Sequence, residues 1–408
     1  MKANRVRWLI AAGIALFAVY QVASVFLSGW LYFRDDRFGY DLRLRRNEVR
    51  CVQLGVDSFK IWDRETTLPG FTPLRRPDKA DVPSAASDAV VHAYPPWHHA
   101  FFYFYGWLHE AMCLSLMSIV FGICLSFIVS ETLRLSRARC DCGGLAAFFA
   151  LSTLAFAATW CYCMLNYGIL ILAAFLLMNR ALEKGHDVAA GLCWAVMMVK
   201  PQVGLLFVWP LFWHRRHRTI LVAAAACALA TLFVAGRVHE SPVDLVLQIP
   251  KIGSPYGTSG FVKFLPASVF GESRTFVVMG AFFALTGLAT WAFRKRGDFL
   301  LSCVPAALAT PLWTYNKEHD AVILLPLFIV LACRAFASRK FGKWAWIACS
   351  YVLASVLFYG WIVLIDRGIV DHTKMQSLRA ILRLLTFAPL AVFAALLVRE
   401  DRLRPPAP

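Results

Sequence analysis

The chain alternates between long apolar runs and short polar connections. Several runs approach the ~20 residues that an α-helix needs to cross a bilayer. Backbone groups inside a bilayer must satisfy their own hydrogen bonds, so the pattern predicts an all-α polytopic membrane protein. The predicted spans are the N-terminal run ending at residue 33 and the segments 107–133, 145–164, 167–178, 219–235, 275–293, 299–313, 321–335, 344–365 and 381–398, with two shorter apolar segments at 188–199 and 203–213.

Composition supports this class. Of the 408 residues, 59% are hydrophobic and 16% are charged, whereas a soluble protein carries about 25% charged residues. We therefore expect one domain, residues 1–408, with about twelve spans. The net charge of +17 does not indicate a nucleic-acid partner, because Lys and Arg lie mostly in short loops between apolar runs. Those loops all fall on one side, which predicts cytoplasmic N- and C-termini.

Two long polar connections interrupt the pattern, residues 34–105 and 236–273, and both are predicted to be extracytoplasmic loops. In the first loop, apolar residues recur from Phe38 through Val56 on one helical face, while the other face is rich in arginine. Such an amphipathic helix is expected to lie on the membrane surface, its cations near lipid phosphates. Asp41 lies near its start, where it could simply be an N-cap or pair with Arg45.

Lys200 lies between the two short apolar segments, in the sequence Lys200-Pro201-Gln202. Neither segment is long enough to cross the bilayer, so we predict a pair of half-depth helices with a polar tip inside the protein. A lysine at such a tip must face a cavity or a partner group. Contact with a phosphate and a structural, capping role are both open for it.

His98 and His99, with His92 nearby, raise the question of a metal site in the first loop. No acidic partner set follows them along the chain, so neither a metal nor any other cofactor is expected. The adjoining Tyr94-Pro95-Pro96-Trp97 is typical of a stiff re-entry into the membrane, with aromatic rings at the interface.

Several of these segments together resemble a known family. Asp41-Leu42-Arg43-Leu44, then Gly55-Val56-Asp57-Ser58-Phe59, then Ala93-Tyr94-Pro95-Pro96-Trp97 resemble the membrane glycosyltransferases of the GT-C class. Within that class they are most similar to glycosyltransferase family 87, which includes mycobacterial mannosyltransferases of phosphatidylinositol mannoside synthesis. Gly55 lies fourteen residues after Asp41, the spacing expected of that pattern.

Looser matches continue the resemblance to about Pro326. They comprise Leu165-Asn166-Tyr167-Gly168, the block from Ala190-Gly191 through Lys200-Pro201 to Arg215-Arg216, and Pro311, Tyr315, His319 and Leu325-Pro326. Two segments depart from the family pattern. Ser58-Phe59 replaces the family's Pro-Tyr, and the segment 253–263 lacks an expected Asn-Gln-Ser-like element. Details of donor or acceptor binding are expected to differ accordingly.

The resemblance implies a GT-C-like bundle and an inverting glycosyltransferase of a bacterial inner (plasma) membrane. Such an enzyme moves a sugar (mannosyl, another hexosyl or pentosyl) from a polyprenyl-phosphate donor to a hydroxyl of a lipid-linked or glycan acceptor on the outer face. Inversion requires one base opposite the leaving group. Asp41 matches the family's aspartate and is the candidate base, with Asp35 and Asp36 as rivals.

The leaving phosphate would be met by cations and hydrogen-bond donors. Lys200 and His319 are the main candidates, although the segment 317–320 around His319 also fits a simple surface cluster. Weaker candidates for contact with the donor phosphate or sugar are Arg34, Lys263, Tyr94 and Tyr315.

Two other functions fit a polytopic chain, a lipid-linked-sugar flippase and a polysaccharide polymerase. A flippase favours internal repeats and paired charges at the membrane midplane, of which few are found. A polymerase is expected to carry its key Arg and His residues in a large late loop, whereas here the loop rich in such residues is the first.

Overall fold

The computed structural model describes residues 38–58, 94–256, 274–294, 298–313 and 318–337, with a few single positions near both ends. The predicted N-terminal span and the last two predicted spans lie outside these ranges. Within them the chain forms helices and no strand.

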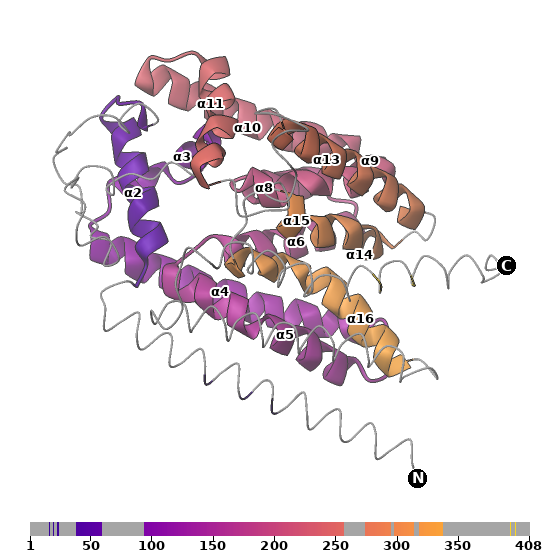
Figure 1. The fold of residues 1–408 in the computed structure, drawn as a ribbon. Coiled ribbons are helices and arrows are strands. Elements are labelled where there is room, and N and C mark those ends of the chain that lie inside the picture. The colour runs from indigo at the N-terminus through magenta and orange to yellow at the C-terminus, as the bar shows by residue number, and fades with distance from the viewer. Residues whose placement is uncertain are drawn as a thin grey trace, which may run out of the picture.

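The helices follow the predicted runs closely (Figure 1). They are α2 (Tyr40–Gln53), α3 (Pro96–Phe101), η2 (Tyr103–Gly106), α4 (Glu110–Arg137), α5 (Gly143–Met164), α6 (Gly168–Glu183), α7 (Asp187–Met197), α8 (Pro201–Gly204), η3 (Leu205–Phe207), α9 (Val208–Trp213), α10 (His217–Val238), α11 (Pro242–Tyr256), α13 (Arg274–Phe293), α14 (Phe299–Ser302), α15 (Val304–Trp313), η8 (Glu318–Leu324) and α16 (Leu325–Ala337).

Among the described residues, α4 and α10 are long and apolar enough to cross a bilayer. A third span is added if the two parts of α5, bent by 57° between Leu154 and Ala157, count as one. The remaining apolar helices are shorter, so the prediction of about twelve spans is not confirmed by this part of the chain. The 236–273 connection contains α11, and α10 extends three residues into it.

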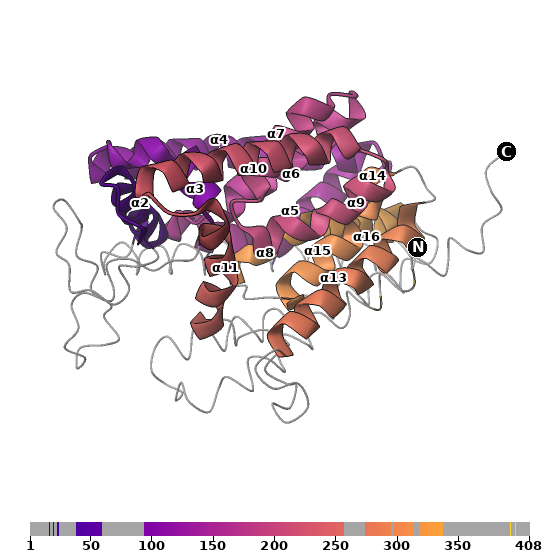
Figure 2. The same cartoon turned by 90° about the horizontal axis from the view of Figure 1, so that it is seen from above.

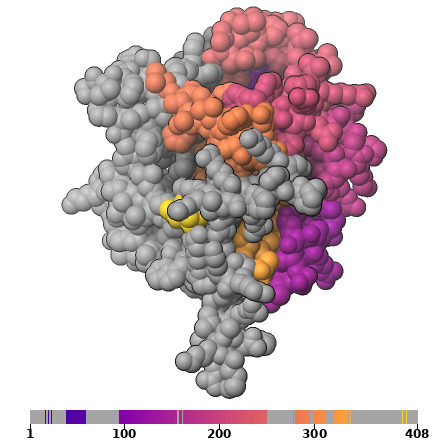
Figure 3. Space-filling model, turned by 90° about the vertical axis from the view of Figure 1, so that its right-hand side faces the viewer, coloured from indigo at the N-terminus to yellow at the C-terminus, as the bar shows by residue number. Residues whose placement is uncertain are grey.

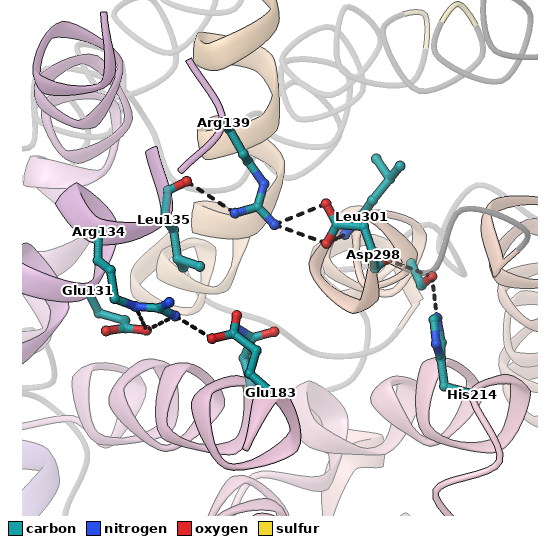
Figure 4. A network of polar contacts seen from close by, with 10 residues as sticks. Glu131, Arg134, Leu135, Arg139, Glu183, His214, Asp298 and Leu301 are labelled. Carbon is teal, nitrogen blue, oxygen red and sulfur yellow. Dashed lines mark hydrogen bonds and ion pairs between the residues drawn. The ribbon is translucent and has the colours of Figure 1, made fainter. Parts of the chain in front are cut away.

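The turns that carry basic residues meet at one end of the bundle, which we call the basic end. Arg134 at the end of α4 contacts Glu183 at the end of α6, with 2.7 Å between Nη2 and Oε2. Arg139 contacts Asp298, before α14, at 3.0 Å (Figure 4). These contacts agree with the prediction that the short basic loops share one side.

The two short apolar helices predicted on either side of Lys200 are present in residues 187–213, while their depth in a bilayer stays a prediction. α7 begins at the basic end, where Asp187 contacts Arg216 at 3.4 Å, and α9 returns there at Trp213. The chain reverses around Lys200, because Pro201 lacks an amide donor and disfavours a helical residue before it. Accordingly Lys200 has φ −115° and ψ 87°. The opposite end of the bundle, with Lys200 and the α5–α6 turn, is called the Asn166 end.

Helices distant in sequence pack together around the core. α7 lies against α6 and α10, α16 against α5, and α13 against α9 and α15. Figure 2 shows α2 and α3 grouped at the same end of the bundle. In Figure 3, the orange atoms of the later helices lie beside the pink atoms of the middle of the chain. The later helices are therefore part of the same bundle as the earlier ones.

α2 is the amphipathic helix predicted in the first loop, but the predicted environment of its arginines is wrong for Arg46. Arg46 is 6% exposed, and its guanidinium donates to the Leu108 carbonyl at 3.0 and 3.1 Å. Arg50 reaches the Gly106 carbonyl at 3.4 Å. Because η2 and the turn after it leave carbonyls without helical partners, arginine donors are bound there rather than at lipid phosphates.

Candidate active site

The centre of the site is the α5–α6 turn. α5 ends at Met164, and its C-cap Leu165 has a left-handed φ of 47°. Asn166 follows with 3% of its surface exposed. The Asn166 carbonyl oxygen accepts from the Gly168 amide at 3.1 Å and from Lys200 Nζ at 2.7 Å. Its amide nitrogen donates to Asp41 Oδ2 at 2.5 Å. Both sides of the carboxamide are thus engaged, which fixes its orientation.

Lys200 completes a buried polar chain. Its ammonium lies 2.6 Å from Asp320 Oδ1, and both residues are 3% exposed. The polar chain therefore runs from Asp41 through Asn166 and Lys200 to Asp320. Its members come from α2, the α5–α6 turn, the α7–α8 turn and η8. Four segments distant in sequence are tied together at the Asn166 end.

A glycine sets the position of Asp41. Gly39, with φ 67°, is the N-cap of α2, and its amide donates to the Cys163 carbonyl at 2.9 Å. A Cβ at this position would lie 2.3 Å from Leu114 Cδ2, so a side chain is excluded unless Leu114 shifts. Asp41 lies in the first turn of α2, where the helix dipole favours a carboxylate. It is not the N-cap, so that alternative is wrong.

Tyr94 lies between two cations. The centre of its ring is 4.4 Å from Arg45 Cζ and 5.8 Å from Lys200 Nζ, and 5% of its surface is exposed. Burial raises the pKa of Tyr94 to about 12, against the opposing effect of Lys200 and Arg45. The phenol therefore stays protonated at neutral pH.

A second buried cluster adjoins Tyr94. Glu48 on α2 pairs with Arg45 through Oε1, and its Oε2 lies 3.2 Å from His99 Nε2. His98 Nε2 lies 3.0 Å from the Tyr167 hydroxyl. Burial, together with His99 and Arg45, lowers the pKa of His98 well below its ordinary value. The sequence argument considered only acidic residues that follow these histidines, whereas the acid beside them comes from α2, which precedes them.

The other predicted site residues lie mostly beyond the described part of the chain. Outside it are Arg34, Asp35, Asp36, Lys263 and Tyr315. His319 lies in η8 next to Asp320, which places its backbone at the Asn166 end. The preference for Asp41 over its rivals Asp35 and Asp36 stays a prediction.

The sequence reasoning missed the roles of Asn166 and Asp320. In the sequence, Asn166 stands out only as part of a turn motif and Asp320 only as a neighbour of His319. The available signal was a polar residue directly at the end of an apolar run, since such a residue must find a partner inside the bundle. Which partner it finds depends on the packing of helices distant in sequence.

The comparison with known protein families identifies the class of protein to which the chain belongs. A model of glycosyltransferase family 87 matches residues 92–298, about half of the chain. The chain belongs to this family. The matched region includes Asn166 and Lys200 but neither Asp41 nor Asp320. No curated protein and no solved structure matches the chain. Family 87 membership makes this chain a glycosyltransferase, and the apolar helices fit a membrane protein.

Proposed function

We propose that this family 87 enzyme transfers a hexosyl or pentosyl group from a polyprenyl phosphate to a hydroxyl of a lipid-linked or glycan acceptor, with inversion. Asp41 is the general base in this proposal. The observation that carries it is the polar chain, which holds one buried carboxylate in a defined orientation through Asn166. A preorganised carboxylate is what deprotonation of an acceptor hydroxyl requires.

The proposed step is a single displacement. Asp41 takes the proton of the acceptor hydroxyl while the hydroxyl oxygen bonds to the anomeric carbon. The bond from that carbon to the phosphate oxygen breaks on the opposite face, and the phosphate leaves with the electron pair. A phosphate is a good leaving group, so no general acid is needed. One base is therefore sufficient.

The contacts of Lys200 suggest how the base is supported. Two of its three ammonium donors are directed to Asn166 and Asp320. We therefore assign Lys200 first to the orientation of Asn166 and Asp41, with its third donor available to the donor phosphate. His319, next to Asp320 in η8, is the further candidate for that phosphate.

The side of the membrane follows from charge. Basic loops favour the cytoplasm, and the polar chain lies at the end of the bundle opposite the basic end. We infer that the reaction takes place at the outer face of a bacterial inner membrane.

The test is transfer of radiolabelled sugar from hexosyl- and pentosyl-polyprenyl phosphates, with purified enzyme in proteoliposomes and a membrane lipid extract as acceptor. Asp41→Asn should lower turnover by about 10²–10⁴-fold, the usual contribution of a positioned base. Asp244→Asn, which changes an exposed carboxylate on α11, is the matched control and should retain activity.

Three outcomes would contradict parts of the proposal. Full activity in Asp41→Asn would remove Asp41 as the base. Absence of transfer from every polyprenyl donor would remove this donor class. An anomeric configuration retained in the product, determined by NMR, would exclude the single displacement.

A further inference from the structure

Beyond the polar chain, the structure contains a second group of chemistry-bearing side chains with no assigned part in sugar transfer. It consists of Glu48 on α2 and the neighbouring His98 and His99 on α3. All three side chains are buried, with exposed fractions of 0%, 0% and 1%. One ligand atom from each lies within 4.8 Å of the others. We propose that Glu48, His98 and His99 form a binding site for one zinc ion.

The donor set favours zinc over hard cations. Two imidazoles and one carboxylate are the three protein ligands of many zinc sites, which leave a fourth position open. Magnesium and calcium instead require mostly oxygen ligands. Two ligand atoms on a tetrahedral zinc ion, each at about 2.0–2.1 Å, lie about 3.3 Å apart. The 3.2 Å between His99 Nε2 and Glu48 Oε2 matches that spacing.

The surroundings of the cluster supply outer-shell contacts to His98 and Glu48. His98 Nε2 lies 3.0 Å from the Tyr167 hydroxyl, while no hydrogen-bond partner for His98 Nδ1 occurs among the described residues. A metal-binding imidazole characteristically uses one nitrogen for the ion and donates the other N–H to a neighbour. The proposed arrangement therefore puts Nδ1 on zinc and the Nε2 proton on Tyr167.

The two carboxylate oxygens of Glu48 likewise have different partners. Oε1 binds Arg45, and Oε2 faces the His99 ring. Arg45 thus acts as an outer-shell donor to the carboxylate and leaves one oxygen for the ion. The alternative is a hydrogen-bonded cluster that supports Arg45 without any metal. The two arrangements differ in whether the folded protein retains zinc.

The proposed ion would join α2 to α3. Asp41 lies on α2 two helical turns before Glu48, and the His98 ring is 4.8 Å from that of Tyr94. A clamp between these helices would hold the helix that carries Asp41 against the membrane re-entry segment. The proposed role of the ion is to hold α2 against α3, and the existence of the site does not depend on the assignment of Asp41 as base.

The experiment measures zinc directly. The full chain is purified in detergent, its affinity tag is removed, and the metal content is determined by mass spectrometry. We expect about one zinc per chain, lost after EDTA and restored by ZnCl₂ but not by MgCl₂, with a rise in melting temperature on restoration. His186→Gln, a change at an exposed histidine near the basic end, is the control and should retain zinc.

Variants identify the ligands. Glu48→Gln, His98→Gln and His99→Gln should each weaken zinc binding at least 100-fold, measured by competition with a chromophoric chelator. Tyr167→Phe should weaken it by about 10–100-fold, as expected for an outer-shell partner. Wild-type protein without bound zinc and without a melting shift on ZnCl₂ addition would overturn the proposal. Equal zinc affinity in wild type and His98→Gln would do the same.

If the ligand variants fail to fold, a measurement on the wild-type protein still tests which residues bind the ion. X-ray absorption of the zinc-loaded chain should show nitrogen and oxygen ligands including two imidazoles. Sulfur ligands would instead place the ion at cysteines and overturn the assignment.

Discussion

At the scale of single residues, the Lys200–Asp320 ion pair is the most costly contact of the polar chain. Both groups are 3% exposed and 2.6 Å apart. Removing two charges from water is expensive, and the pair recovers this cost only while both partners are present. Asn166 shares the ammonium, so disturbance of the pair should also reach Asp41.

The prediction is a double-mutant cycle. Lys200→Met or Asp320→Leu alone leaves one buried charge unpaired and should lower the free energy of unfolding by about 3–5 kcal/mol. The double variant should be more stable than either single one. Denaturant unfolding in detergent measures all four proteins. If the loss of unfolding free energy in the double variant equals the sum of the two single losses, the two charges do not stabilise each other.

Sugar transfer gives a second measurement on the same proteins. The double variant should recover stability without recovering activity, because Asn166 then lacks the donor that orients it. If activity returned together with stability, the ammonium would have no role in positioning Asp41.

At the scale of elements, the placement of α2 depends on Gly39. Its φ of 67° is in the left-handed region, and the surrounding Leu114 and Leu165 side chains fill the space of a Cβ. Gly185 has a similar φ of 75°, but nothing lies within 4 Å of an added Cβ. The chain therefore offers two glycines with the same backbone requirement and different packing.

Gly39→Ala and Gly185→Ala should separate these effects. A left-handed alanine costs about 1–2 kcal/mol at either position. Gly39→Ala should cost more, and it alone should lower sugar transfer, because it displaces the start of α2 and Asp41. Thermal unfolding and turnover measure the two effects. Equal losses of stability and equal turnover in both variants would show that packing at Gly39 does not position the site.

At the scale of the whole molecule, contacts at the basic end connect helices distant in sequence. His214, after α9, lies 2.7 Å from Ser302 Oγ of α14, and Arg139 binds Asp298, the N-cap of α14 (Figure 4). Burial and the nearby Arg216 lower the pKa of His214, while Asp298 opposes the shift. The folded protein therefore favours the neutral imidazole at His214.

This shift predicts a pH dependence of stability. The unfolded chain has the ordinary histidine pKa of about 6.5, so below that pH it binds more protons at this position than the folded protein does. The contribution of His214 is fully present above pH about 6.5 and is lost as the pH falls below it. Other groups titrate in this window as well, so the comparison is with His214→Gln.

The melting temperature at pH 7.5 minus that at pH 5.5 should be larger for the wild type than for His214→Gln. An equal difference in both proteins would show that the imidazole titrates alike in the folded and unfolded states.

Much of the fold was predictable because it depends on local order along the chain. The bounds of α4, α5, α10 and α13 lie within a few residues of the predicted spans, since apolar length sets where a membrane helix begins and ends. The break at Lys200-Pro201 was also predictable, because proline acts through its own backbone. Family membership agrees with the ordered motifs around Asn166 and Lys200.

Only the tertiary structure decided which polar groups meet. It brings three pairs that are far apart in sequence into polar contact: Asp41 with Asn166, Lys200 with Asp320, and Glu48 with His99. It also shows that Arg46, which the sequence predicts near lipid phosphates, donates to the Leu108 carbonyl instead. The physical reason is that a buried polar group requires a partner, and the chemistry of the residue does not specify which one. The packing of four separate segments selects it.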